Sequence, residues 1–244
     1  MSMNTNYLSI FGLASMIFIA NTHADNIMNN DRVVKIDFDY RQSVSNIQSN
    51  GTCLGVLLNP LVVLTSSECV YNKDLSEIDV STPDDDTKIG YGTNLSSSVN
   101  LFSTKKNIGW KLIPNSSLAL LKLSKPIIFT PKYDIAQHCK PDQLSKYIDR
   151  PTAIYAFDDK DSNKIINDEN KISDIIDVID HDGKIAILDD DLTIDKTDSG
   201  GAWVSGNSIV AITVRGIGDH SIFGALICPY SKVVFHDAKV LEYN

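Results

Sequence analysis

Asp198-Ser199-Gly200-Gly201 is the segment of this sequence whose residue types are best suited to chemistry. A serine hydroxyl can attack a carbonyl carbon when a neighbouring base takes its proton, and it does little without one. A carboxylate follows a run of hydroxyl residues in Thr65-Ser66-Ser67-Glu68-Cys69, and a serine opens the apolar run Ser117-Leu118-Ala119-Leu120-Leu121-Lys122-Leu123. Neither segment contains a histidine, the side chain that most often serves as the base.

These three segments resemble the motifs of the trypsin-like (chymotrypsin-fold) serine proteases. That family carries Gly-Asp-Ser-Gly-Gly-Pro at its nucleophile, Thr-Ala-Ala-His-Cys at its base and Asp-Ile-Ala-Leu-Leu-Lys-Leu at its orienting aspartate. The resemblance implies that Ser199 stands at the nucleophile position, Glu68 at the histidine position and Ser117 at the aspartate position.

Three more segments resemble the family in the same chain order. Cys53-Leu54-Gly55-Val56-Leu57-Leu58-Asn59-Pro60 is similar to Cys-Gly-Gly-Ser-Leu-Ile-Asn-Pro. Ile209-Val210-Ala211-Ile212-Thr213-Val214-Arg215-Gly216 is similar to Leu-Val-Gly-Ile-Val-Ser-Trp-Gly, and Gly224-Ala225-Leu226-Ile227 stands where the family has Gly-Val-Tyr-Thr. The resemblance implies an all-β fold of two six-stranded antiparallel β-barrels (chymotrypsin-like) with a short C-terminal helix. The family's active site lies in the cleft between the barrels.

The replacements at the catalytic positions are chemically unfavourable for peptide hydrolysis. A carboxylate, with an ordinary pKa of about 4.3, is a much weaker base than imidazole at about 6.5. Glu68 also lacks the second nitrogen through which a histidine links nucleophile and aspartate. Ser117 brings no charge to stabilise a protonated base. The resemblance therefore implies an inactive protease homologue.

The expected oxyanion hole and substrate pocket depart from the family as well. Thr197 replaces the glycine whose backbone N–H donates to the oxyanion, and a β-branched residue restricts the backbone at that position. A donor lost through such a change typically costs about 2.7–4 kcal/mol of transition-state stabilisation. Thr193 stands where trypsin-like pockets have the aspartate that binds Lys or Arg. Val214 and Arg215 replace the Ser-Trp wall of the pocket. His220 is the histidine near the expected cleft, and none of the five falls in a family motif; the others are His23, His138, His181 and His236.

Three functions remain open. The first is a secreted, inactive serine protease homologue that acts by binding a protein partner, as an immune or host-defence regulator or decoy. The second is a secreted serine hydrolase of altered mechanism that uses Ser199 with Glu68. The third is a structural role in venom, saliva or gut, with the family match reflecting ancestry.

The N-terminus indicates a secreted protein, and the net charge limits its partners. Residues 7–20 form an apolar stretch and Thr22-His23-Ala24 offers a cleavage point, so residues 1–24 are predicted to be a signal peptide and 25–244 the trypsin-like domain. The net charge of −9 and the pI of 4.9 argue against a nucleic-acid or anionic-membrane partner. We expect no cofactor, no metal and no membrane contact after cleavage.

Four cysteines are an even set in a sequence with secretory features, which favours disulfides over zinc. The spacing of Cys53 and Cys69 is that of the family's histidine-loop disulfide, so the resemblance implies that bond. For the remaining two, Cys139 and Cys228, we predict a bond that ties the connection between the barrels to the end of the second barrel. The alternatives are two buried free thiols or pairing with another chain. Sequons for N-glycosylation occur at Asn50, Asn94 and Asn115.

Alternating apolar runs and turn residues place the strands. Gly55–Leu58 and Leu61–Leu64 flank Asn59-Pro60 as a hairpin, and Ile175–Ile179 and Lys184–Leu188 flank Asp180-His181-Asp182-Gly183 as another. Barrel one is expected over about residues 33–135 and barrel two over about 140–230. A helix is expected over Ser231–Leu241, with one apolar face made by Val233, Val234, Val240 and Leu241.

Arg32-Val33-Val34-Lys35 has two interpretations. It resembles the Arg-Ile-Val-Gly-Gly junction at which family zymogens are cut, after which the new ammonium group would pair with Asp198. The two glycines are replaced by Lys35 and Ile36. The alternative is that the same residues simply begin the first strand.

Overall fold

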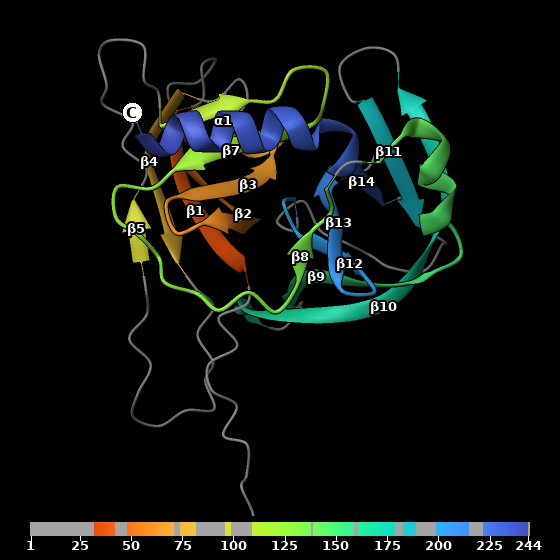
Figure 1. Ribbon diagram of the computed structural model, residues 1–244. Helices are drawn as coiled ribbons and strands as arrows, with labels where there is room; N and C mark the ends of the chain where they lie inside the picture. The colour runs from red at the N-terminus through yellow and green to blue at the C-terminus, as the bar shows by residue number, and fades with distance from the viewer. Residues whose placement is uncertain are drawn as a thin grey trace, which may run out of the picture.

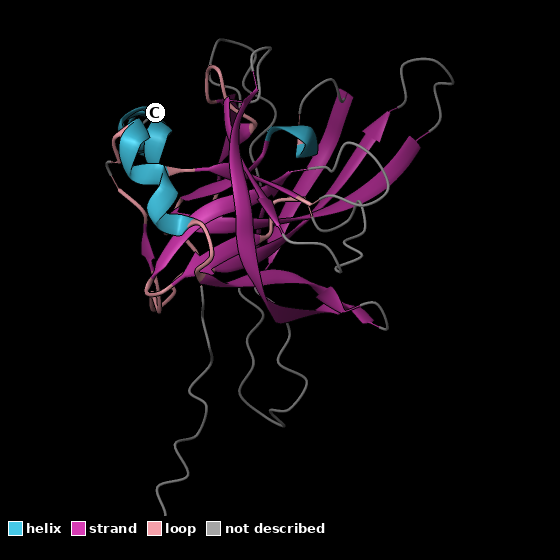
Figure 2. Cartoon of the chain, turned by 90° about the vertical axis from the view of Figure 1, so that its right-hand side faces the viewer, coloured by secondary structure: helices cyan, strands magenta, loops and turns pink. Residues whose placement is uncertain are grey.

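The computed structural model describes residues 32–41, 48–70, 74–81, 96–98, 109–137, 139–158, 161–178, 183–188, 199–214 and 222–243. Strands dominate these residues, and one α-helix lies at the C-terminal end. Figure 1 shows two sheets side by side, and Figure 2 shows the helix on one side of the strands. Among the described helices, none is long and apolar enough to cross a membrane.

The first sheet is built around the hairpin that the sequence predicts. Its strands follow the order β5-β4-β1-β2-β3-β7-β6. Asn59 ends β2, and its side-chain Oδ1 accepts a hydrogen bond from the backbone N–H of Leu61 at 2.8 Å, which fixes the turn into β3. The bounds are β1 Val33–Arg41, β2 Gln48–Asn59, β3 Val62–Ser66, β4 Asp74–Ser81, β5 Ser96–Ser98, β6 Trp110–Leu112 and β7 Leu118–Lys122.

The second sheet closes on itself. Its order is β12-β9-β10-β11-β14-β13-β8, and β12 also pairs with β13. Six antiparallel strands thereby form a barrel, and the short β8 adds to β13 in parallel. The bounds are β8 Asp134–Ile135, β9 Pro151–Asp158, β10 Asp161–Val178, β11 Gly183–Leu188, β12 Ala202–Ser205, β13 Ser208–Val214 and β14 Phe223–Leu226.

The predicted fold class is confirmed: the chain is mostly β, with two sheets and one short C-terminal helix, consistent with a chymotrypsin-like two-barrel fold. The hairpin of β10 and β11 is also present. However, β10 is 18 residues long, where the sequence predicts a short strand from Ile175. The barrel boundaries at 33–135 and 140–230 stay predictions.

The C-terminal helix α1, Ser231–Tyr243, lies across the first sheet and contacts β7 and β3 (Figure 1). The expected apolar face is wrong in part: Val234 and Leu241 are buried, whereas Val233 and Val240 are 41% and 40% exposed. Two polar contacts help to set the rotation of the helix. Asp237 pairs with Lys111 at 2.8 Å, and the Asn59 side-chain N–H donates to Glu242 at 3.2 Å.

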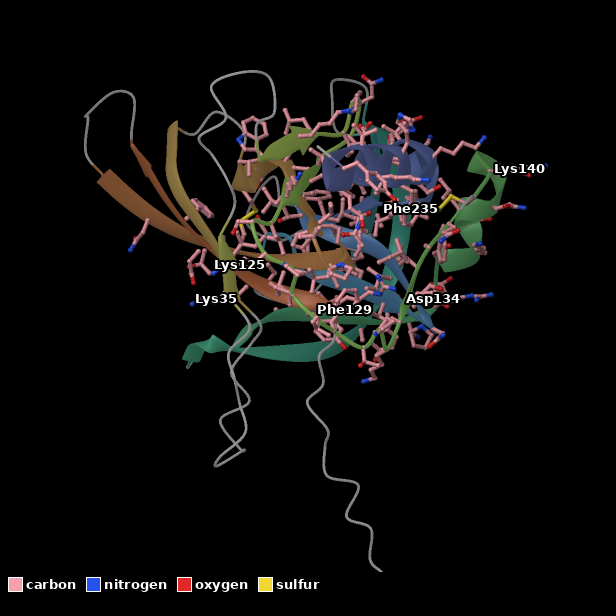
Figure 3. The ribbon with its side chains drawn as sticks, turned by 60° about the vertical axis from the view of Figure 1, so that its left-hand side comes forward. Lys35, Lys125, Phe129, Asp134, Lys140 and Phe235 are labelled. Atoms are coloured by element: carbon pink, nitrogen blue, oxygen red, sulfur yellow. A yellow bond between two sulfur atoms is a disulfide. The ribbon has the colours of Figure 1, made fainter. Side chains whose placement is uncertain are left out.

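Arg32 ties β2 to the segment that connects the two barrels. Its Nε donates to the carbonyl of Tyr133 at 2.9 Å, and Nη1 donates to the carbonyls of Leu57 and Leu58 at 3.0 and 3.1 Å. The guanidinium also lies over the ring of Phe129, 5.2 Å from its centre. Figure 3 shows Phe129 and Asp134 along this connecting segment.

The strand interpretation of Arg32-Val33-Val34-Lys35 is therefore favoured over the zymogen junction. Val33 and Val34 are buried in β1 and paired with Val56 and Gly55 of β2. A protease would need to unfold this end of β1 to reach the bond after Arg32.

Candidate functional site

Ser199 lies at the junction of the two sheets, just before β12. Its carbonyl accepts a hydrogen bond from the backbone N–H of Leu54 in β2 at 2.8 Å. On the other side, Gly200 N–H donates to the Thr213 carbonyl at 2.8 Å, and Thr213 N–H donates to the Gly201 carbonyl at 2.7 Å. The loop is therefore held by backbone bonds to both sheets, and Ser199 is only 5% exposed.

Gly200 is required by this arrangement. Its φ is +92°, which L-residues with a Cβ rarely adopt, and an added Cβ would lie 1.7 Å from the carbonyl oxygen of Leu54. The loop conformation and the close approach of β2 thus both depend on the absence of a side chain at residue 200.

Glu68 faces Ser199 across the junction. It lies in the 3-10 turn Ser67–Cys69 that follows β3, where the Ser66 hydroxyl accepts the Glu68 N–H at 3.3 Å. The Ser199 hydroxyl donates to Oε2 of Glu68 at 3.5 Å. Glu68 is an exposed residue, whereas Ser199 is buried.

Ser117 completes the group. It is 6% exposed and comes immediately before β7. Its carbonyl accepts a hydrogen bond from the Ser67 N–H at 2.8 Å, which places it beside the Glu68 turn. The structure thus brings together the three segments that the sequence singles out. No charged side chain stands at 117 to orient a base.

Two buried threonines support the site, and their roles are not predicted by the sequence. The Thr65 hydroxyl donates to the Leu54 carbonyl at 2.7 Å, and the Thr213 hydroxyl accepts the indole N–H of Trp203 at 2.8 Å. Both bonds fix strands that carry the backbone of Ser199. Thr65 lies inside a segment that resembles a family motif, but the sequence does not predict that its hydroxyl bonds to Leu54.

Several predicted site residues lie outside the described residues. They are Thr193, Thr197, Asp198, Arg215, His23, His138, His181, His220 and the sequon Asn94. Val214 is described: it ends β13 and is 5% exposed. His236 is exposed on α1.

The four cysteines form two disulfides within the chain. Cys53–Cys69 joins β2 to the Glu68 turn, as the resemblance implies, with Cα atoms 6.3 Å apart. Cys139–Cys228 joins the segment between the barrels to the turn just after β14, with Cα atoms 5.3 Å apart, and this confirms the predicted bond. In Figure 3 a yellow sulfur–sulfur bond lies close to the labelled Lys140.

The family model described as "Trypsin" matches residues 27–232. The chain belongs to the trypsin family. No curated protein sequence matches this family member. Among solved structures it is similar to the crystal structure of the scabies mite inactivated protease paralogue S-I1, with a TM-score of 0.55 and 15% identity. That match covers 85% of this chain and 94% of the mite protein, and at this identity it supports the trypsin-like fold.

Proposed function

We propose that this trypsin-family protein is secreted, is catalytically inactive, and acts by binding another protein as a regulator or decoy in host defence. The observation that carries the proposal is the contact between Ser199 and Glu68, because a carboxylate occupies the place of the general base. A neutral serine, Ser117, occupies the place of the orienting acid.

The geometry gives a chemical reason for inactivity. A histidine base accepts the serine proton on one nitrogen while its other N–H is held by a carboxylate. Glu68 has no second site of this kind. These replacements remove the histidine base and the orienting acid, and Thr197 puts a β-branched residue at the position where the family has its oxyanion glycine.

Secretion is supported by the chemistry of the cysteines. The four described cysteines form two disulfides, and such bonds persist in oxidising compartments such as the extracellular space. The preserved scaffold around Ser199 supports a binding role. A folded protein that lacks the catalytic base still has a defined surface that a partner protein can bind. The mite neighbour, which is described as an inactivated protease paralogue, is consistent with a loss of catalysis in this fold.

A serine hydrolase of altered mechanism is the second candidate, and the same contact favours it. The Ser199 hydroxyl already donates to a carboxylate that could take its proton. Against it, the contact distance is at the upper limit for a hydrogen bond and the serine is 5% exposed. An attacking serine must also be reached by the substrate.

A fluorophosphonate probe separates the two candidates. We expect no labelling of the folded protein, with trypsin as the positive control and Ser199→Ala as the matched blank. Labelling that Ser199→Ala abolishes would support the hydrolase. The binding role is tested separately, with immobilised native protein and extracellular fluid of its source, against a reduced and alkylated copy. A saturable partner retained only by the native protein is the expected result.

A further inference from the structure

Asn115-Ser116-Ser117 is a glycosylation sequon that includes one residue of the degenerate triad, our name for Glu68, Ser117 and Ser199 at the family's three catalytic positions. The hydroxyl residue that completes the sequon is Ser117, the residue at the position of the orienting aspartate. An aspartate at 117 would leave no Asn-x-Ser/Thr pattern there. One serine therefore both removes the triad charge and creates the acceptor motif.

The structure presents Asn115 well for a bulky attachment. It lies in the turn between β6 and β7 and is exposed. Its φ of 55° is in the left-handed region that asparagine tolerates better than most residues, as expected at a turn tip. No hydrogen bond to its carboxamide is found within the described part of the chain, so an attached sugar breaks no contact of the described fold.

We propose that Asn115 carries an N-linked oligosaccharide and that the Ser117 hydroxyl defines its sequon. The co-reactant is a lipid-diphosphate-linked oligosaccharide of the secretory pathway. A bond forms between Asn115 Nδ2 and the anomeric carbon, the glycosyl–phosphate bond breaks, the lipid diphosphate leaves and Nδ2 gives up one proton. Transfer to the nascent chain precedes folding, so the burial of Ser117 in the final fold does not prevent it.

The attachment deepens the proposed function, and it rests on the secretion contained in that proposal. Asn115 is two residues from Ser117, whose carbonyl is bonded to the turn that carries Glu68. Two residues span at most about 7 Å. A large, hydrophilic group therefore stands at the rim of the degenerate site.

The test uses the full chain expressed in a eukaryotic secretory host, with peptide mapping of the secreted protein. Enzymatic removal of N-glycans by an amidase converts an occupied asparagine to aspartate, so the Asn115 peptide should gain about 1 Da. Asn115→Gln and Ser117→Ala should each lose one glycan from the intact mass. Ser117→Thr is the matched control and should keep it, and Asn50→Gln should leave Asn115 occupied.

Each outcome has one meaning. Secreted protein with an unmodified Asn115 peptide overturns this inference and leaves the proposed function standing. Protein retained in the cytosol, with reduced cysteines and no glycan on any sequon, instead overturns secretion and this inference with it. If Ser117→Ala fails to fold, the wild-type peptide and Asn115→Gln still decide.

Discussion

The backbone N–H of Leu54 donates to the carbonyl of Ser199 at 2.8 Å and joins the first sheet to the loop of the second. Leu54 follows Cys53, whose disulfide partner Cys69 lies beside Glu68. One short stretch of β2 therefore positions both the serine loop and the turn opposite it. The group formed by Ser199, Glu68 and Ser117 is therefore also part of the junction between the two sheets.

Gly200→Ala should destabilise the protein strongly. The alanine would need the left-handed backbone, at about 1–2 kcal/mol, and its Cβ would overlap the Leu54 carbonyl, which adds about 1–3 kcal/mol of overpacking. We expect the free energy of unfolding to fall by about 2–5 kcal/mol, measured from the midpoint and slope of urea unfolding.

Gly206→Ala is the matched control. Gly206 also has positive φ, +62°, but nothing lies within 4 Å of an added Cβ. Gly206→Ala should therefore lower the free energy of unfolding only through the left-handed backbone conformation, by about 1–2 kcal/mol. Equal losses for the two variants would show that the Cβ added at residue 200 is accommodated beside Leu54 without a steric cost.

Removing the Cys139–Cys228 bond should cost more than removing Cys53–Cys69. The two bonds close loops with sequence separations of 89 and 16 residues. On the chain-entropy account the difference is about 1.5 kcal/mol. Double serine variants, Cys139→Ser with Cys228→Ser and Cys53→Ser with Cys69→Ser, should show that order in urea. The reverse order would mean that native-state contacts of the Glu68 turn outweigh chain entropy.

The sequence predicts local features of this fold well because their signals are local. The hairpin at Asn59 and the spacing of Cys53 and Cys69 are of this kind. The length of β10 was not predictable, because its polar middle around Asp168 is held in strand form by pairing with β9. The rotation of α1 also depends on distant residues: Lys111 holds Asp237, and this leaves Val233 outside the core.

At the candidate site, the sequence predicts which residues lie close together but not which hydrogen bonds hold them there. Motif order alone places Glu68 opposite Ser199. The bond from Trp203 to Thr213 and the anchoring of Arg32 join residues far apart in the chain, with no motif to mark them.

Arg32→Ala should destabilise the junction by about 2–4 kcal/mol, since it leaves three carbonyls without their charged donor. Burial lowers the pKa of Arg32, while the charge of Asp134 opposes that shift. Arg32→Lys should lose most of the same stability, because an ammonium cannot present the forked donors. The exposed Arg150 is the control, and Arg150→Ala should change stability by less than about 0.5 kcal/mol.

The contacts of Arg32 and the burial of Val33 also predict that the chain resists cleavage after Arg32. Limited trypsin treatment of the native protein should leave the Arg32–Val33 bond intact, because Val33 is buried in β1. N-terminal sequencing of the digest checks this. A new terminus at Val33, formed without loss of the fold, would restore the zymogen interpretation.

The wild-type protein should show no peptidase activity, and restoring single catalytic positions should do little, because the triad acts as a unit. Glu68→His, Ser117→Asp and Thr197→Gly together should give weak turnover of peptide esters, since a placed base contributes about 10²–10⁴-fold. Ser117→Asp also destroys the Asn115 sequon, so Asn115→Gln is the control for any effect of the glycan. Adding Ser199→Ala to the triple variant should abolish the gain. Wild-type turnover that disappears in Ser199→Ala would contradict inactivity and favour a Glu68-assisted hydrolase.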